Sequence, residues 1–107
     1  MTRKIHEENE RMKRRYLQHR KRAQRKDIKS VEKDAEGILR FEQCTGYKSF
    51  KRFHIEQVIK FQDQLENQMS KATGKPLSKS TIRSILMANK RFFFWLADQS
   101  GYKSRIR

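Results

Sequence analysis

Apolar residues in the last third of the chain recur at spacings of three and four. The stretch 77–96 reads LSKSTIRSILMANKRFFFWL, and a helical turn of about 100° per residue gathers its apolar positions on one face. Such a stripe is typical of an amphipathic helix that buries one side. Ser78 suits the N-cap, Leu77 and Ile82 suit a hydrophobic staple, and Gly101 suits the stop. The predicted buried face comprises Ile82, Ile85, Leu86, Asn89, Phe92, Phe93 and Leu96.

Three members of this stretch need a separate explanation. Asn89 is the one polar residue on the apolar face and requires hydrogen-bond partners if it is buried. Phe94 and Trp95 lie off that face. Either neighbouring helices cover these two rings, or one flank of the helix is a contact surface for another macromolecule.

Two further core helices are predicted upstream. The first begins at Ser30 as N-cap, runs to about Gln43 and ends at Thr45-Gly46. Gly37 inside it costs roughly 1 kcal/mol relative to alanine, which indicates close packing or a weak point. Its broad apolar side comprises Val31, Ala35, Ile38, Leu39 and Phe41.

The other core helix is expected over 54–70, after a loop whose Phe50 and Phe53 plug the core. Its expected buried face comprises Ile55, Val58, Ile59, Leu65 and Met69, with Phe61 at the edge.

Residues 6–26 lack glycine and proline and also favour a helix. Its stripe of Met12, Tyr16 and Ala23, joined by His19, is too thin to fix the helix strongly on a core. We therefore expect a solvated helix, or one that becomes ordered on an acidic partner. The chain as a whole predicts a small all-α bundle, with a basic helical extension at 1–29 and a helical domain at 30–107.

Charge narrows the range of partners. The 107 residues hold 27 Lys and Arg against 12 Asp and Glu, a net charge of +15. Such an excess attracts polyanions: DNA, RNA or anionic membranes. No apolar run is long enough to span a bilayer, and the basic helix lacks the Trp and Phe of a membrane-surface helix. We expect no membrane partner.

The sequence offers no constellation typical of catalysis. The three histidines are scattered, no Cys/His spacing suits zinc, and no glycine-rich loop suits phosphate. Cys44 is the only cysteine, which fits a reducing cytoplasm, and no signal peptide is visible. We expect a cytoplasmic chain that is not an enzyme and holds no metal or cofactor.

The order of these segments resembles a known family. The segments ILRFEQCTG, HIEQVIKFQDQL and LSKSTIRSILMANKRFFFWLADQSGY follow one another and lead into a basic tail. Residues 30–107 thereby resemble the SAM-like, core-binding N-terminal domain of tyrosine recombinases, the phage integrase family. The most telling positions are Leu77, Ser78, Thr81, Ile82, Phe92, Phe93, Trp95, Leu96 and Gly101.

The resemblance implies a four-helix SAM-like bundle that forms one half of a clamp around double-stranded DNA. It implies a catalytic domain downstream, other recombinase subunits in a synaptic complex, and a bacterial or phage protein associated with the nucleoid. In this family the last helix and the first bundle helix face the duplex. The implied DNA contacts are Lys79, Ser80, Arg83, Met87 and Lys90, with Lys29, Ser30, Lys33 and Arg40 on the earlier helix.

The residues themselves agree in part with these implied DNA contacts. Lys79, Arg83 and Lys90 line one flank beside the apolar stripe, where they can neutralise phosphates.

Three interpretations of the function stay open. The first is this DNA-binding module. The second is an RNA-binding or ribosome-associated helical protein anchored by residues 6–26. The third is a protein-interaction module with Phe94 and Trp95 as a docking patch.

Overall fold

The computed structural model describes residues 6–22, 25, 27–68, 74–99 and 101–102. Four α-helices make up the fold: α1 (Glu7–Arg22), α2 (Ile28–Thr45), α3 (Ile55–Glu66) and α4 (Lys79–Ala97). A 3₁₀ turn, Phe50–Arg52, lies between α2 and α3. No strand occurs among the described residues. The prediction of a small all-α bundle is confirmed, with the basic helix as one of the four.

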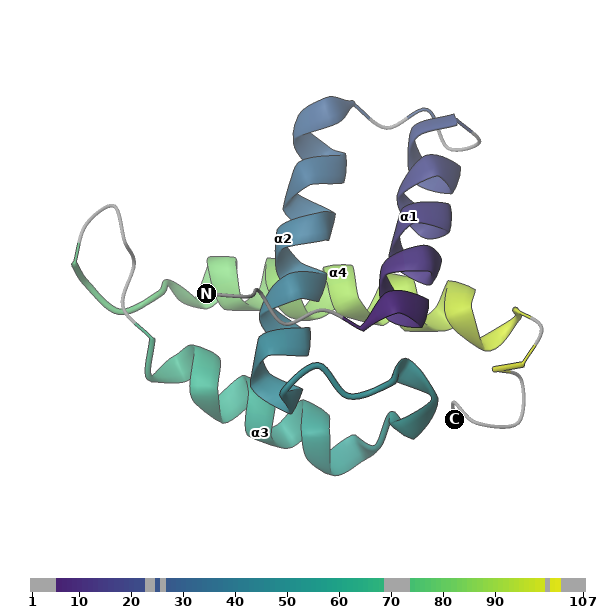
Figure 1. Ribbon diagram of the computed structural model, residues 1–107. Helices are drawn as coiled ribbons and strands as arrows, with labels where there is room; N and C mark the ends of the chain where they lie inside the picture. Colours follow the sequence, from purple (N-terminus) through teal and green to yellow (C-terminus); the bar gives the residue numbers. More distant parts are fainter. Residues whose placement is uncertain (1–5, 23–24, 26, 69–73, 100, 103–107) are drawn as a thin grey trace, which may run out of the picture.

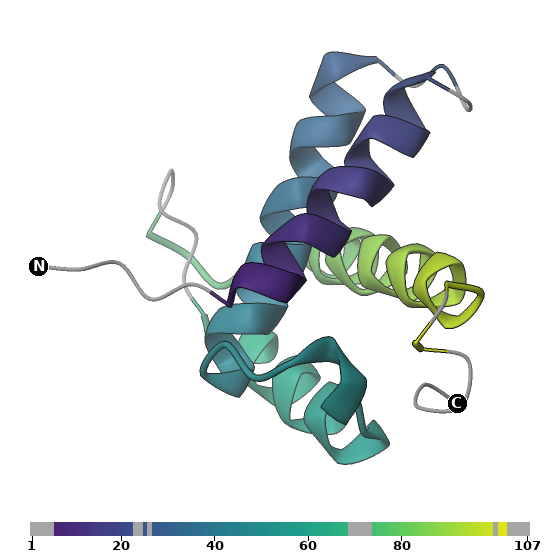
Figure 2. The ribbon, with the colours of Figure 1, turned by 45° about the vertical axis from the view of Figure 1, so that its right-hand side comes forward.

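The helices form two crossed pairs (Figure 1). α1 and α2 lie side by side and run in opposite directions, and α4 crosses both (Figures 1 and 2). α3 runs opposite to α4 beneath the end of α2. α2 and α4 each pack against all three of the other helices, so their crossing is the centre of the bundle.

The helix ends show which capping predictions hold. Ser78 caps α4, because its Oγ accepts a hydrogen bond from the Thr81 N–H at 3.1 Å. Gly46 ends α2 in the left-handed conformation, with φ of 71°. The predicted start of α2 was wrong: Asp27 is the N-cap, and the Ser30 N–H donates to its carboxylate at 2.8 Å. A carboxylate satisfies the first-turn amides as well as a serine does and also favours the helix dipole.

An aromatic cluster fills the core and accounts for two of the three consecutive phenylalanines. Phe92 and Phe93 are buried, and both contact Phe50, with ring centroids 5.1 and 5.6 Å away. Phe53 packs on Phe93 at 4.2 Å, so both loop phenylalanines plug the core as expected. Phe94 is 67% exposed.

The predicted face of α3 was wrong in part. Ile55 and Ile59 are 62% and 56% exposed, whereas Phe61, placed at the edge by the sequence, is buried together with Leu65. Phe61 meets the Phe41 ring edge-on at 5.3 Å, and this contact turns α3 so that its isoleucines lie on the flank. Met69 lies outside the described residues.

The basic helix is fixed more firmly than its thin stripe suggested. Met12 and Tyr16 are 1% and 2% exposed and belong to the core cluster. Tyr16 contacts Trp95 at 5.4 Å between ring centroids, so α1 covers that indole. The expectation of a weakly fixed helix was wrong, because its polar residues also bind the bundle. Ala23 lies outside the described residues.

Those polar contacts centre on Glu42, which is fully buried in α2. Its carboxylate forms an ion pair with Lys13 and accepts a hydrogen bond from Asn9 Nδ2 at 3.3 Å. Asn9 also donates to the Lys48 carbonyl at 2.8 Å and accepts from the Phe50 N–H at 3.0 Å. This network joins α1 to α2 and to the loop that carries Phe50.

Adjacent phenylalanines test the helical face of α4. Phe93→Ala should lower the free energy of unfolding by about 3 to 5 kcal/mol, because it leaves a cavity among packed rings. Phe94→Ala should change it by about 0.5 kcal/mol or less, since the ring is largely in solvent. Urea denaturation measures both, and equal costs would contradict the orientation of α4.

Lys13→Met tests the attachment of α1. The substitution keeps the length of the side chain but leaves the buried Glu42 carboxylate without its cation, which should cost about 3 to 5 kcal/mol. Lys21→Met, on the exposed side of the same helix, is the matched control and should lie within about 0.5 kcal/mol of the parent. Indistinguishable urea midpoints for the two variants would refute the buried ion pair.

Candidate nucleic-acid interface

The exposed side of α4 carries cations from its first residue to Lys90. Lys79, Arg83 and Lys90 lie on this side with Met87 among them, and all four are exposed. None of the three cations pairs with a carboxylate among the described residues. α4 itself contains no Asp or Glu. The face therefore presents positive charge without local neutralisation.

The start of α4 adds hydroxyl and amide donors. Ser80 is exposed in the first turn, directly after the Ser78 cap. Helix N-termini carry partial positive charge and unpaired N–H groups, which favour phosphate oxygens. Ser80 and Lys79 thus combine three kinds of phosphate donor at one end of the helix.

A polar groove of about 490 Å³ lies between α2 and α4, beside the place where the two helices pack together. We call it the α2–α4 groove. From α2 it takes Ser30 and Lys33, and from α4 it takes Ser80, so it brings together residues about 50 positions apart. Lys29 is exposed one helical turn before Lys33 but does not line the groove. The full lining is Arg20, Ser30, Lys33, Asp34, Glu36, Gly37, Arg40, Ser80, Thr81, Ser84, Ile85, Ala88 and Arg91.

Arg40 lines the same groove, but its guanidinium already has partners. Nη1 donates to Gln68 at 2.7 Å, and Nη2 lies 3.4 Å from the Glu36 carboxylate. Arg40 would have to give up these contacts to bind a phosphate. Lys29 and Lys33 have no such partner among the described residues, so they are the stronger candidates on α2.

The sequence-based set missed two arginines at the groove wall. Asp34 is buried and accepts from Arg20 Nε at 2.8 Å and from Arg91 Nη2 at 3.2 Å. One carboxylate thus holds two guanidiniums, and the trio keeps a net positive charge. Arg91 retains 45% of its side-chain exposure, so it still faces solvent. The available signal was Asp34 itself, a carboxylate four residues before buried Ile38, which called for a cation.

Arg20, Asp34 and Arg91 also act electrostatically on the buried Tyr16 phenol. Burial raises the pKa of the Tyr16 phenol, and the nearby Arg20 guanidinium opposes that effect. The phenol therefore stays neutral at physiological pH and adds no negative charge beneath the groove.

Burial raises the pKa of the Cys44 thiol, which disfavours the reactive thiolate. No group of three or more His, Cys, Asp or Glu side chains in the described ranges could hold a metal ion. None of the described helices has the length and apolarity to cross a bilayer.

Eight of the nine sequence-predicted contacts divide between two sides of α4, and Lys29 lines neither side. Ser30, Lys33, Arg40 and Ser80 line the α2–α4 groove. Lys79, Arg83 and Met87 border a depression toward α3, and Met87 and Lys90 border an apolar groove between α3 and α4. The exposed side chains of Lys79, Arg83, Met87 and Lys90 form what we call the exposed ridge of α4. The ridge lies between the two sides, so a long ligand bound along it reaches both.

A scan against protein-family models and searches of curated proteins and of solved structures found no match to this chain. The resemblance to tyrosine recombinases therefore rests on the sequence motif and stays a prediction.

The two arginines on Asp34 should differ in their structural role. Arg20→Met removes the buried partner and should cost about 3 to 5 kcal/mol of unfolding free energy. Arg91→Met removes a half-exposed partner while Arg20 still holds Asp34, and should cost about 1 kcal/mol or less. Urea melts of the two variants check this order, and the reverse order would contradict the arrangement of the trio.

Proposed function

We propose that this chain binds the phosphate backbone of duplex DNA through the exposed ridge of α4 and the adjoining α2–α4 groove. The observation that carries the proposal is the side of α4 on which Lys79, Arg83 and Lys90 pair with no carboxylate of the described residues. Neutralising phosphates with such cations releases counterions, which is the main source of affinity for DNA.

The shape of the ridge supports a duplex as the ligand. The cations from Lys79 to Lys90 in α4 span about 17 Å at 1.5 Å per residue, roughly half a turn of B-DNA. Lys33 on α2 and Ser80 on α4 lie across the groove from one another and could follow a curved backbone. Most such contacts position a protein on DNA and carry little sequence information.

Beyond DNA binding in general, we propose more specifically that the chain is the core-binding domain of a site-specific tyrosine recombinase. Its support is the motif of residues 77–101, whose Ser78 cap and buried Phe92 and Phe93 fit the all-α bundle. On this proposal catalysis belongs to a downstream domain, and other recombinase subunits assemble on the same DNA. The expected compartment is the bacterial or phage-infected cytoplasm, in contact with the nucleoid.

One specific observation favours the alternative of RNA binding. α1 presents a second cationic face, because Arg14, Arg15, Lys21 and Arg22 are all exposed. A ribosome-associated or RNA-binding protein could use this face as its anchor. The two candidates therefore differ in the helix that carries the contacts as well as in the ligand.

Fluorescence anisotropy separates them. The chain is titrated against a labelled 20–30 base-pair duplex and a matched RNA hairpin at several salt concentrations. We expect preference for the duplex, with a log–log salt slope near −0.9 per phosphate contacted. Arg83→Ala/Lys90→Ala should flatten that slope by about two phosphate contacts and leave the thermal melt unchanged.

Arg14→Ala/Arg15→Ala is the control of equal charge on α1, and its slope for DNA should stay near that of the parent. If the α1 pair flattens the slope and the α4 pair does not, the interface on α4 is wrong. Preference for the hairpin would replace DNA with RNA as the ligand.

A further inference from the structure

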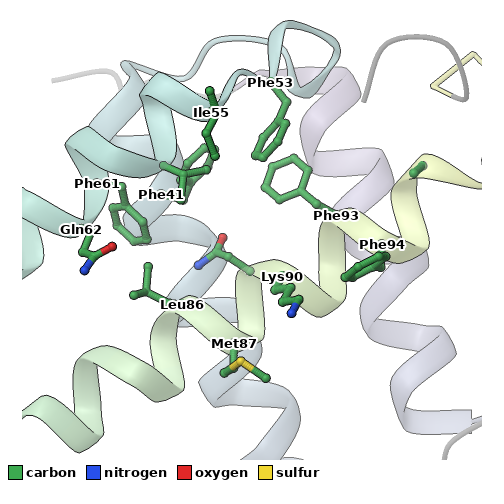
Figure 3. A pocket seen from close by; sticks show the side chains of 13 residues that line it. Phe41, Phe53, Ile55, Phe61, Gln62, Leu86, Met87, Lys90, Phe93 and Phe94 are labelled. Atoms are coloured by element: carbon green, nitrogen blue, oxygen red, sulfur yellow. The ribbon is translucent and has the colours of Figure 1, made fainter. Parts of the chain in front are cut away.

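An apolar groove of about 510 Å³ runs between α3 and α4. We call it the α3–α4 groove. Figure 3 shows Ile55, Phe61 and Gln62 along the α3 side and Leu86, Met87 and Phe94 along the α4 side. It is separate from the polar α2–α4 groove, which lies on the other flank of α4.

Large apolar side chains are exposed at this groove to an unusual extent. The described residues include five exposed large hydrophobic residues, and three of them, Ile55, Met87 and Phe94, line it. Ile59 follows Ile55 by one helical turn on the same helix and is exposed as well. Contiguous apolar surface of this kind marks a site of interaction.

The floor of the groove is already ordered. Phe41 meets Phe61 at 5.3 Å and Phe93 at 5.4 Å, both edge-on, and all three rings line the groove. These rings belong to α2, α3 and α4, so the core itself fixes their positions. A ligand would meet a preformed surface and would avoid the cost of ordering it.

Charge identifies the kind of occupant. Lys90 is the one charged residue lining the groove, and its Nζ lies 5.8 Å from the centroid of the Phe94 ring at the edge of the groove. A carboxylate on the ligand could pair with this ammonium at the rim. A second copy of the chain fits poorly, because each copy carries a net charge of +15 and the two would repel.

We propose that the α3–α4 groove docks an acidic amphipathic helix of a partner protein. Apolar residues at i, i+3, i+4 and i+7 would pack against the exposed Ile55, Met87 and Phe94, over a floor of buried rings. A flanking Asp or Glu would pair with Lys90. The 12 residues of α3 give a groove wall about 18 Å long, which matches about three turns of helix. The floor of the groove contains none of the predicted DNA contacts, but the rim shares Met87 and Lys90 with them. The peptide experiment below contains no DNA, so it tests this groove separately from the proposed DNA binding.

A designed peptide tests the proposal. The probe is a fluorescein-labelled 14-residue helix with leucines at i, i+3, i+4 and i+7 and glutamates on the other face. A scrambled peptide of the same composition keeps the charge but loses the apolar face. We expect the helical peptide to bind at least about tenfold more tightly than the scrambled one.

Substitutions in the chain locate the binding site. Ile55→Ala/Phe94→Ala should weaken the helical peptide by about tenfold or more. Ile28→Ala, which removes an equally exposed isoleucine away from the groove, should leave its affinity unchanged. Lys90→Ala should weaken the peptide more than Lys33→Ala does, since Lys33 lines the other groove.

Three outcomes would overturn the proposal. Equal affinity for the two peptides would mean that the chain attracts acidic peptides by charge alone. Failure of Ile55→Ala/Phe94→Ala to reduce binding would place the peptide elsewhere. Light scattering that shows a dimer, converted to monomer by Phe94→Ala, would identify a second copy as the occupant.

Discussion

The close crossing of α2 and α4 is the constraint on which the rest of the molecule depends. Gly37 is buried at the crossing, where an added Cβ would lie 3.5 Å from the Ala88 methyl group. Asn89 Nδ2 donates to the Gly37 carbonyl at 2.9 Å and to the Ile85 carbonyl at 3.0 Å. Small residues at the contact and the Asn89 amide, which donates one hydrogen bond to each helix, thus fix two helices whose exposed sides carry the candidate interface.

Ion pairs inside the bundle determine how the charges are distributed. Asp34 and Glu42 point into the bundle, where they hold Arg20, Arg91 and Lys13. Two of the few carboxylates are therefore used internally, each beside a cation that stabilises the packing. Because Lys13 and Arg20 are buried with these two carboxylates, the pairing adds no net charge to the surface. The outer faces of α4 and α1 carry exposed lysines and arginines.

Sequence reasoning predicted α4 well because its signals are local. The Ser78 cap, the stripe through Phe93 and the demand of Asn89 for partners all follow from neighbours in the chain. The α3 face was predicted less well, because Ile55 and Phe61 are both strongly apolar, and it is contact with rings from other helices, such as Phe41 on α2, that buries Phe61. The sequence left open whether neighbouring helices cover Phe94 and Trp95. In the structure α1 covers Trp95, and no described helix covers Phe94.

The residues of the candidate site also divide into those that local sequence signals predicted and those that depend on contacts between helices. Lys79, Arg83 and Lys90 share a flank that helical periodicity alone could identify. The pairing of Arg91 with Asp34 joins residues 57 positions apart. The hydrogen bond that Arg40 donates to Gln68 joins residues 28 positions apart. Such contacts depend on the way the helices cross, and no spacing in the sequence encodes them directly.

Amide chemical-shift mapping with a 20–30 base-pair duplex tests the central claim most directly. Titration of the ¹⁵N-labelled chain reports each backbone position while the fold stays intact. The account predicts the largest shifts on the first turn and exposed ridge of α4 and around Lys33 of α2. Shifts concentrated on α1 around Arg14 and Arg15, with α4 unchanged, would contradict it.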